Sequence, residues 1–388
     1  MFRSLFYLLL TLVPAAACLW DRDTWREEAK GRIDTLKAIT GWFDRYPPRY
    51  YEMRLERVTN ELESKPAEFD LYDDAGVACN RLGRYDEAIA WMARKKAMLD
   101  ATPSTVGKMD RYRYHANLGS FLGNRWAVRP PSERKGDITD LVAATHHIAE
   151  AIELNPDAHF GREKYQLKLF QWLQREAEQE GRIYAPEQNF LGVAARNRIG
   201  SGGLEPHPEL HDAESGLIGL IHLGSAWESI DVFDALGTLV QLDGASSLSL
   251  LVEMRLRELE ESGHRSLHPA ESHQRNPHGL LVQSREPLEE WYQDARRAAK
   301  ARGEAWVAYQ TGRFERGMHP DTHPEFWRDW EEREFPDLPG PSLVDRAKAN
   351  PGLSMSLFFL AISLGAVGLY HFLNRRACKD NLAKAPTS

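Results

Sequence analysis

Histidine is the chemically reactive residue type that is most densely clustered in this sequence. Four histidines lie within fifteen residues: His264, His268, His273 and His278. A pair, His319 and His323, follows them. Imidazole nitrogens are common zinc ligands, so this density raises the question of a metal site. A spacing of four would place two rings on one helical face, but Pro269 and Pro320 interrupt helices there. We therefore predict solvated polar loops and no bound metal.

Other signatures of catalysis are missing from the sequence. There is no G-x-S-x-G, H-E-x-x-H or G-x-G-x-x-G motif, and "TVGKMD" lacks the upstream glycine spacing and the hydroxyl residue after Lys108 that a phosphate loop needs. Cys79 lies at an inward position of an expected helix, where a free thiol packs as a small hydrophobe. We predict no catalytic residue and no cofactor.

Composition indicates a globular protein without a nucleic-acid partner. The 388 residues are 42% hydrophobic and 27% charged, which is enough for one large or two modest cores. The formal net charge is -8, and the sequence has no concentrated cluster of basic residues that could neutralise the phosphates of a nucleic acid. Three widely spaced cysteines, Cys18, Cys79 and Cys378, form neither a CxxC metal site nor a disulfide framework.

The first residues resemble a secretory signal peptide. A basic start at Arg3 precedes an apolar stretch of about ten residues, and Ala15 and Ala17 supply the small residues of a cleavage site. We predict a signal peptide over 1–17. The Ala-Ala-Ala-Cys segment also loosely resembles a lipoprotein box, so lipidation of Cys18 is a second possibility.

A segment near the other end is long and apolar enough to cross a bilayer. Residues 353–373 carry no formal charge over about 20 positions. Basic residues follow the segment at Arg375 and Arg376, whereas acidic residues precede it. The positive-inside rule then predicts a cytoplasmic tail over 374–388 and an extracytoplasmic body, joined to the span by a proline-rich stalk over 336–352.

The body between these segments is helical by pattern, and we find no convincing strand of period two. Gly-, Pro-, Ser- and His-rich loops over 197–211 and 262–279 divide it. We expect helical repeats over 22–190, a further helical repeat region with loops over 191–280 and a helical segment over 281–335.

Two glycines in "DDAGVACNRLGRYDEAIAWM" (73–92) need a reason, because glycine inside a helix costs about 1 kcal/mol relative to alanine. Small and large residues follow one another around them: Tyr72, Ala75, Gly76, Cys79, Gly83, Tyr85, Ala88 and Met92. This pattern resembles the tetratricopeptide (TPR) repeat, in which two antiparallel helices approach closely. The resemblance implies that Gly76 lies at the close approach and that Gly83 ends the first helix.

The pattern recurs twice. "YHANLGSFL" gives Leu118, Gly119 and Leu122, and after an insertion around "RPPSERKGD" the second-helix spacing continues with Ala144, Ile148, Ala151 and Pro156. "VFDALGTLVQLDG" gives Phe233, Leu236, Gly237, Val240 and Gly244, although Ser249 and Glu253 replace the expected alanine and aromatic. We also expect a second helix over about 51–64 and a first helix after Pro156. The sequence thus predicts an all-α fold, a solenoid of helical hairpins plus one C-terminal transmembrane helix.

Stacked hairpins of this family expose a concave face lined by first helices, on which peptides dock. By resemblance, the side chains that flank the packing positions would face that groove: Asp73, Val77, Asn80, Arg81, Ala116, Ser120 and Asn124. We predict a scaffold held in the membrane by one span, which binds a protein or peptide partner on the extracytoplasmic side. The alternative is an exported enzyme, metal-dependent in one version, with its site near the His-rich loops of 190–335.

Overall fold

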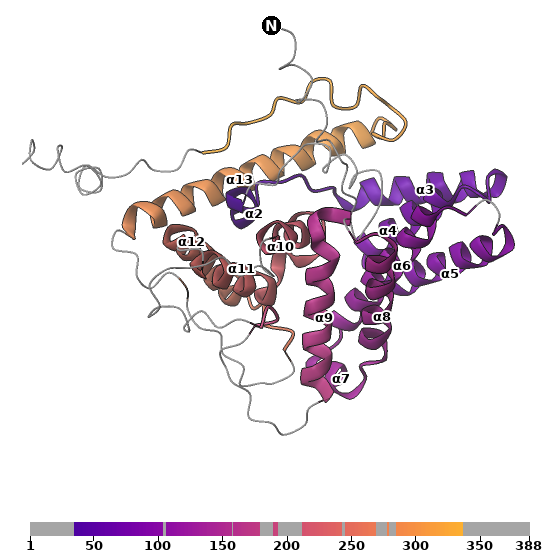
Figure 1. Ribbon diagram of the computed structural model, residues 1–388. Helices are drawn as coiled ribbons and strands as arrows, with labels where there is room; N and C mark the ends of the chain where they lie inside the picture. Colours follow the sequence, from indigo (N-terminus) through magenta and orange to yellow (C-terminus); the bar gives the residue numbers. More distant parts are fainter. Residues whose placement is uncertain are drawn as a thin grey trace, which may run out of the picture. The chain divides into compact units, whose positions relative to one another are not determined.

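The computed structural model describes residues 35–103, 106–156, 158–178, 189–192, 212–242, 245–268, 278 and 285–336. Helices account for most of them (Figure 1). Their bounds are α2 Thr35–Thr40, α3 Pro48–Ser64, α4 Phe69–Arg81, α5 Tyr85–Ala101, α6 Lys108–Ala127, α7 Pro131–Gly136, α8 Thr139–Leu154, α9 Arg162–Glu178, α10 Ala213–His222, α11 Ile230–Leu242, α12 Ser246–Glu261 and α13 Glu286–Phe314. Two short 3-10 turns, η1 Ala158–Gly161 and η4 Ala226–Glu228, precede α9 and α11.

The predicted all-α class is confirmed for this part of the chain, in which no strand occurs. No helix among the described residues combines the length and the apolar character that a bilayer crossing requires. The predicted signal peptide, Cys18, the span over 353–373 and the tail over 374–388 lie outside the described residues, as does the stalk beyond Pro336.

Consecutive helices from α3 to α6 pack against their neighbours, and α6 packs extensively against α8. Gly83 ends the first of these hairpins with a φ of +74°, a backbone conformation that glycine adopts without strain. A Cβ at Gly76 would lie 2.9 Å from both Met92 on α5 and Phe121 on α6. At Gly119 it would lie 2.9 Å from Ile148 and 3.1 Å from the carbonyl oxygen of Ala144. These two glycines therefore lie where helices approach closely.

The third glycine of the pattern has a different neighbour. A Cβ at Gly237 on α11 would lie 2.5 Å from the ring of His278, which belongs to the predicted His-rich loop. The atoms nearest to this position belong to an imidazole, whereas at Gly76 and Gly119 they belong to neighbouring helices. The close helix-to-helix contact expected at Gly237 is therefore replaced by a contact with His278, and the insertion after α6 contains a short helix, α7, in addition to a turn.

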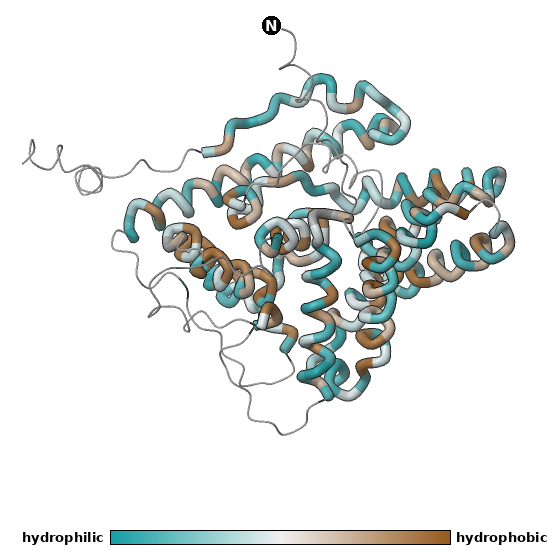
Figure 2. Tube along the Cα trace, in the orientation of Figure 1, coloured by the Kyte–Doolittle hydropathy of each residue, from teal (hydrophilic) through white to brown (hydrophobic). Residues whose placement is uncertain are grey.

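One continuous apolar cluster runs through the described helices, and Figure 2 shows its hydrophobic residues along α10, α11 and α12. Its fully buried members come from widely separated helices, among them Ile39, Val58, Met92, Phe121 and Leu256. Burial of apolar area at about 25 cal/mol per Å² is the main favourable term for such a body.

The long helix α13 connects the two ends of this body. It packs against α12, α2 and α3. Arg302 on α13 forms an ion pair with Asp44, at 2.7 Å, and Arg296 donates to the carbonyl oxygen of Thr40, at 2.8 Å. The segment after α2 is thereby fixed against α13, and the residues of that segment take part in the site described next.

Candidate binding groove

The predicted first helices do not present a fully open face, because α10 of the same chain packs near them. Arg81, the last residue of α4, donates to the carbonyl oxygens of Leu223 and Gly224 at 2.6 and 3.0 Å. On α10 itself, a Cβ at Gly219 would lie 3.1 Å from Arg162 of α9. The end of α10 and the turn after it therefore cover part of the surface that a partner would meet.

A polar cavity of about 560 Å³ lies beside this turn, and we call it the Arg81 cavity. The segment 43–46, the end of α4 and the turn 221–228 line it. Its polar side chains include Arg45, Asn80, Arg81 and Tyr85. Its volume falls in the range of cavities that take small molecules or the side chains of a bound peptide.

A smaller cavity of about 130 Å³ lies on the other side of the same turn, and we call it the Gln166 cavity. Leu169, Phe170 and Val232 form apolar walls, while Ser120 and Gln166 supply polar atoms. Gln166 Nε2 donates to Ser120 Oγ at 3.2 Å, but Gln166 Oε1, in a side chain that is buried, has no hydrogen-bond partner among the described residues. The cavity thus offers an acceptor to a ligand that reaches it.

The two cavities are neighbours. Gly224 and Ser225 line both of them. Across the junction, Asn124 Nδ2 on α6 donates to Asn80 Oδ1 on α4 at 3.1 Å. We call the two cavities together the candidate groove. It runs beside α4, α6 and α9, the helices that the sequence predicts as first helices.

Four of the seven predicted groove residues line these cavities, and three do not. Asn80 and Arg81 line the Arg81 cavity, and Ser120 and Asn124 line the Gln166 cavity. Asp73, Val77 and Ala116 line neither cavity and are buried, at 0%, 1% and 0% exposure, whereas Asn80 and Ser120, each 4% exposed, lie in a cavity wall. The prediction of a groove-facing side chain is wrong for these three residues.

Asp73 has a structural reason to be inside. Its carboxylate accepts from Lys95 Nζ at 2.5 Å and from Asn117 Nδ2 at 3.0 Å, and the side chains of both ion-pair members have no exposure. Burial of a charge is tolerated when it is paired and hydrogen-bonded in this way. Asp73 therefore links α4, α5 and α6, and its carboxylate is not available to a binding partner.

Three residues that line the two cavities were not predicted from the sequence: Gln166 of the Gln166 cavity, and Arg45 and Trp227 of the Arg81 cavity. Gln166 lies 46 residues after Ser120, close to the 44 residues between Asn80 and Asn124. Continuing the register by one unit onto the helix after Pro156 would have pointed to it. Arg45 and Trp227 lie outside the repeat pattern, and no periodic signal identifies them.

The histidines of the predicted loops have structural partners. His278 Nε2 lies 3.2 Å from Asp234 Oδ1, and His319 Nε2 lies 3.1 Å from the carbonyl oxygen of Tyr50. In the described ranges, no group of three or more His, Cys, Asp or Glu side chains could hold a metal ion. His273 lies outside the described residues.

A different histidine pair is close and was not predicted. His115 Nδ1 on α6 and His147 Nδ1 on α8 are 3.0 Å apart. Desolvation lowers the pKa of each ring to about 4, and the charges of the neighbouring histidines act in the same direction. At neutral pH both rings are therefore uncharged, and one can donate to the other.

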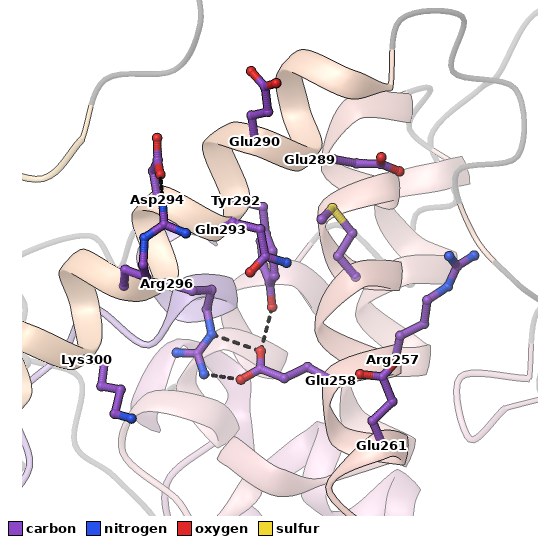
Figure 3. A pocket seen from close by; sticks show the side chains of 12 residues that line it. Arg257, Glu258, Glu261, Glu289, Glu290, Tyr292, Gln293, Asp294, Arg296 and Lys300 are labelled. Carbon is purple, nitrogen blue, oxygen red and sulfur yellow. Dashed lines mark hydrogen bonds and ion pairs between the residues drawn. The ribbon is translucent and has the colours of Figure 1, made fainter.

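An open hollow of about 940 Å³ also lies between α12 and α13 (Figure 3). Its charged side chains largely pair with one another: Glu258 accepts from Tyr292 and Arg296, and Arg297 pairs with Asp294. Because these charges compensate each other, this hollow offers less for a ligand than the candidate groove does.

Comparison with known proteins finds no matching family model, no matching curated protein and no matching solved structure. The geometry of the groove and the sequence pattern are therefore the grounds for a function.

Proposed function

We propose that this protein is a membrane-anchored scaffold of the TPR type, which binds a protein or peptide partner in the candidate groove on the extracytoplasmic side. The observation that carries the proposal is the pair of adjoining cavities beside α4, α6 and α9, bridged by the hydrogen bond between Asn80 and Asn124. Polar side chains that converge in a concave site and are not needed by the apolar core are typical of binding surfaces.

The repeat part of the proposal is supported by the packing of α4 on α5 and of α6 on α8. Gly76 and Gly119 lie at the close contacts, as the repeat pattern requires. Each hairpin alone buries too little apolar surface, so stacking on a neighbour stabilises it. The resulting solenoid would present α4, α6 and α9 side by side to a partner.

The anchoring part rests on sequence. The apolar segment 353–373 has the length of a span, and Arg375 and Arg376 follow it. A membrane-impermeant maleimide added to intact cells tests the topology on the full chain. With Cys18 replaced by serine and Cys79 buried, we expect labelling of Cys378 only after permeabilisation. Labelling in intact cells would contradict a cytoplasmic tail.

The groove itself is tested by photocrosslinking in intact membranes. A benzoylphenylalanine in place of Tyr85, which lines the Arg81 cavity, should capture a specific partner. The same group in place of Met109, which is 37% exposed and lines neither cavity, is the positional control.

Combined with Asn80→Ala and Asn124→Ala, the crosslink at position 85 should be lost. Asn155→Ala is the matched control, because Asn155 lies at the end of α8 and lines neither cavity. Capture of the same protein from positions 85 and 109, or capture that survives the double substitution, would refute the groove as the binding site.

A further inference from the structure

Three arginines surround one tryptophan at the edge of the candidate groove. The guanidinium carbons of Arg255, Arg45 and Arg296 lie 3.7, 4.6 and 5.2 Å from the ring centroid of Trp227. Each position is within the range of a cation–π interaction. Three positive charges this close repel one another, so the arrangement needs negative charge nearby.

Glu258 supplies that charge to two of the three. It lies 3.1 Å from Arg255 Nη1. It also accepts from Arg296 Nε and from the hydroxyl of Tyr292, both at 2.9 Å (Figure 3). Burial alone would raise the pKa of Glu258, but the hydrogen bond from Arg296 and the charge of Arg255 outweigh it and lower the pKa to about 2. The carboxylate is thus fully ionised and is shared by both arginines.

Arg45 is the member without such a partner. Its guanidinium lies 4.6 Å from the ring centroids of both Phe43 and Trp227, which meet edge to face 5.3 Å apart, and no carboxylate in the described part of the chain forms an ion pair with it. Partial desolvation against these rings, together with the charges of Arg255 and Arg296, lowers the pKa of Arg45 to about 10. The guanidinium remains charged at neutral pH.

The same guanidinium belongs to the wall of the Arg81 cavity. Two carboxylates also line this cavity. Asp44 forms an ion pair with Arg302, at 2.7 Å, and Glu228 attracts Arg45 only at longer range, without an ion pair. Asn80 adds a side-chain amide to the wall of the same cavity. An incoming anion would therefore meet a planar donor that lies over two aromatic rings and forms no ion pair with a carboxylate in the described part of the chain.

We propose that the Arg81 cavity is a carboxylate-binding subsite, in which Arg45 receives an acidic group of a bound peptide. This inference rests on the proposed function, since it names the chemistry of the partner segment. A hydrogen bond to a charged group is worth more than a neutral one, so replacement of the acid by its amide should weaken binding about tenfold.

Fluorescence anisotropy with the full chain in detergent micelles tests the subsite. The probes are four pools of labelled nonapeptides with randomised flanking positions, which carry a central Asp-Glu or Asn-Gln pair and end in a free carboxylate or an amide. We expect the Asp-Glu pools, the carboxylate-terminated pools or both to bind about tenfold tighter than the doubly neutral pool. The four arms distinguish an acidic side chain from a chain terminus as the source of the carboxylate.

Two substitutions assign the preference to this cavity. Arg45→Met keeps an apolar side chain against the two rings and should abolish the discrimination. Arg49→Met, at an exposed arginine of α3 that pairs with Glu52, should leave it unchanged. Glu228→Gln removes the carboxylate of the cavity wall that, unlike Asp44, forms no ion pair with an arginine among the described residues, and it should strengthen acidic binding two- to threefold, because a like charge is removed.

Each other result is informative. Equal binding of all four pools, absence of binding, or discrimination that persists in Arg45→Met would overturn the carboxylate subsite while leaving the crosslinking test of the groove intact. Discrimination that depends on Arg45, together with partner capture that survives the Asn80 and Asn124 substitutions, would support the subsite and refute the part of the proposed groove at Asn80 and Asn124.

Discussion

Arg54 and Asp321 form an ion pair, 2.7 Å between Nη2 and Oδ1, although 267 residues separate them. Both side chains are fully buried. Arg54 Nε also donates to the same carboxylate at 2.9 Å, and Arg57 approaches it at 2.6 Å. The segment after α13 is thus attached to α3 through one carboxylate and two guanidiniums.

Loss of that carboxylate should be costly. Asp321→Asn leaves the buried charge of Arg54 without its partner, and we expect a loss of about 3–5 kcal/mol in the free energy of unfolding. Urea denaturation of the full chain in micelles, followed by tryptophan fluorescence, measures it. Asp294→Asn is the control, because Asp294 is exposed and its pair with Arg297 should contribute less than about 1 kcal/mol. Equal effects of the two substitutions would argue against the buried pair.

The close helix contact at Gly119 predicts a second stability effect. Gly119→Ala places a methyl group 2.9 Å from Ile148 and 3.1 Å from the backbone oxygen of Ala144, and overpacking of this kind costs about 1–3 kcal/mol. Gly303→Ala on α13 meets nothing within 4 Å and should instead stabilise the protein by up to about 1 kcal/mol through helix propensity. If both substitutions stabilise, α6 and α8 do not approach as closely as described.

The histidine pair between α6 and α8 predicts a pH dependence. The folded-state pKa of His115 and of His147 is about 4, below the ordinary value of 6.5, so the unfolded chain binds more protons between these values. Stability should therefore be complete above about pH 6.5 and fall as the pH decreases toward 4. The titratable and charged side chains that face the pair are His146, Lys96, Arg111 and Glu150.

The substitution His147→Asn should reduce the loss of stability on going from pH 7 to pH 5. The urea midpoint of unfolding at the two pH values measures this loss. Some decline will remain, because burial also lowers the pKa of His319 to about 4. An unchanged slope in His147→Asn would show that the pair does not titrate as its contact implies.

The hairpins could be predicted because their signal is local. Gly76, Gly83 and Gly119 reveal close contacts and a turn through their spacing alone, and α4, α5, α6 and α8 follow it. Gly237 shows the limit of the same signal, since a missing side chain indicates a close neighbour without identifying it. Here the neighbour is an imidazole from a loop.

The groove could be predicted only in part, for a different reason. Asn80 and Asp73 lie two helical turns apart on α4, and a polar residue in either place favours a solvent-facing interpretation. Only the position of Lys95 and Asn117 makes Asp73 a core residue. Contacts such as Arg81 with the turn after α10 have no periodicity at all, so local pattern cannot anticipate them.

The contrast between Asn80 and Asp73 gives the sharpest test of that distinction. The double substitution Asn80→Ala and Asn124→Ala removes both members of one hydrogen bond and should change the free energy of unfolding by less than about 1 kcal/mol. Asp73→Asn, which leaves Lys95 buried without a counter-charge, should cost about 3–5 kcal/mol. Urea denaturation of the three chains under one condition compares them. A double variant as unstable as Asp73→Asn would mean that Asn80 and Asn124 serve the core, and their loss of partner capture could then no longer be assigned to a binding surface.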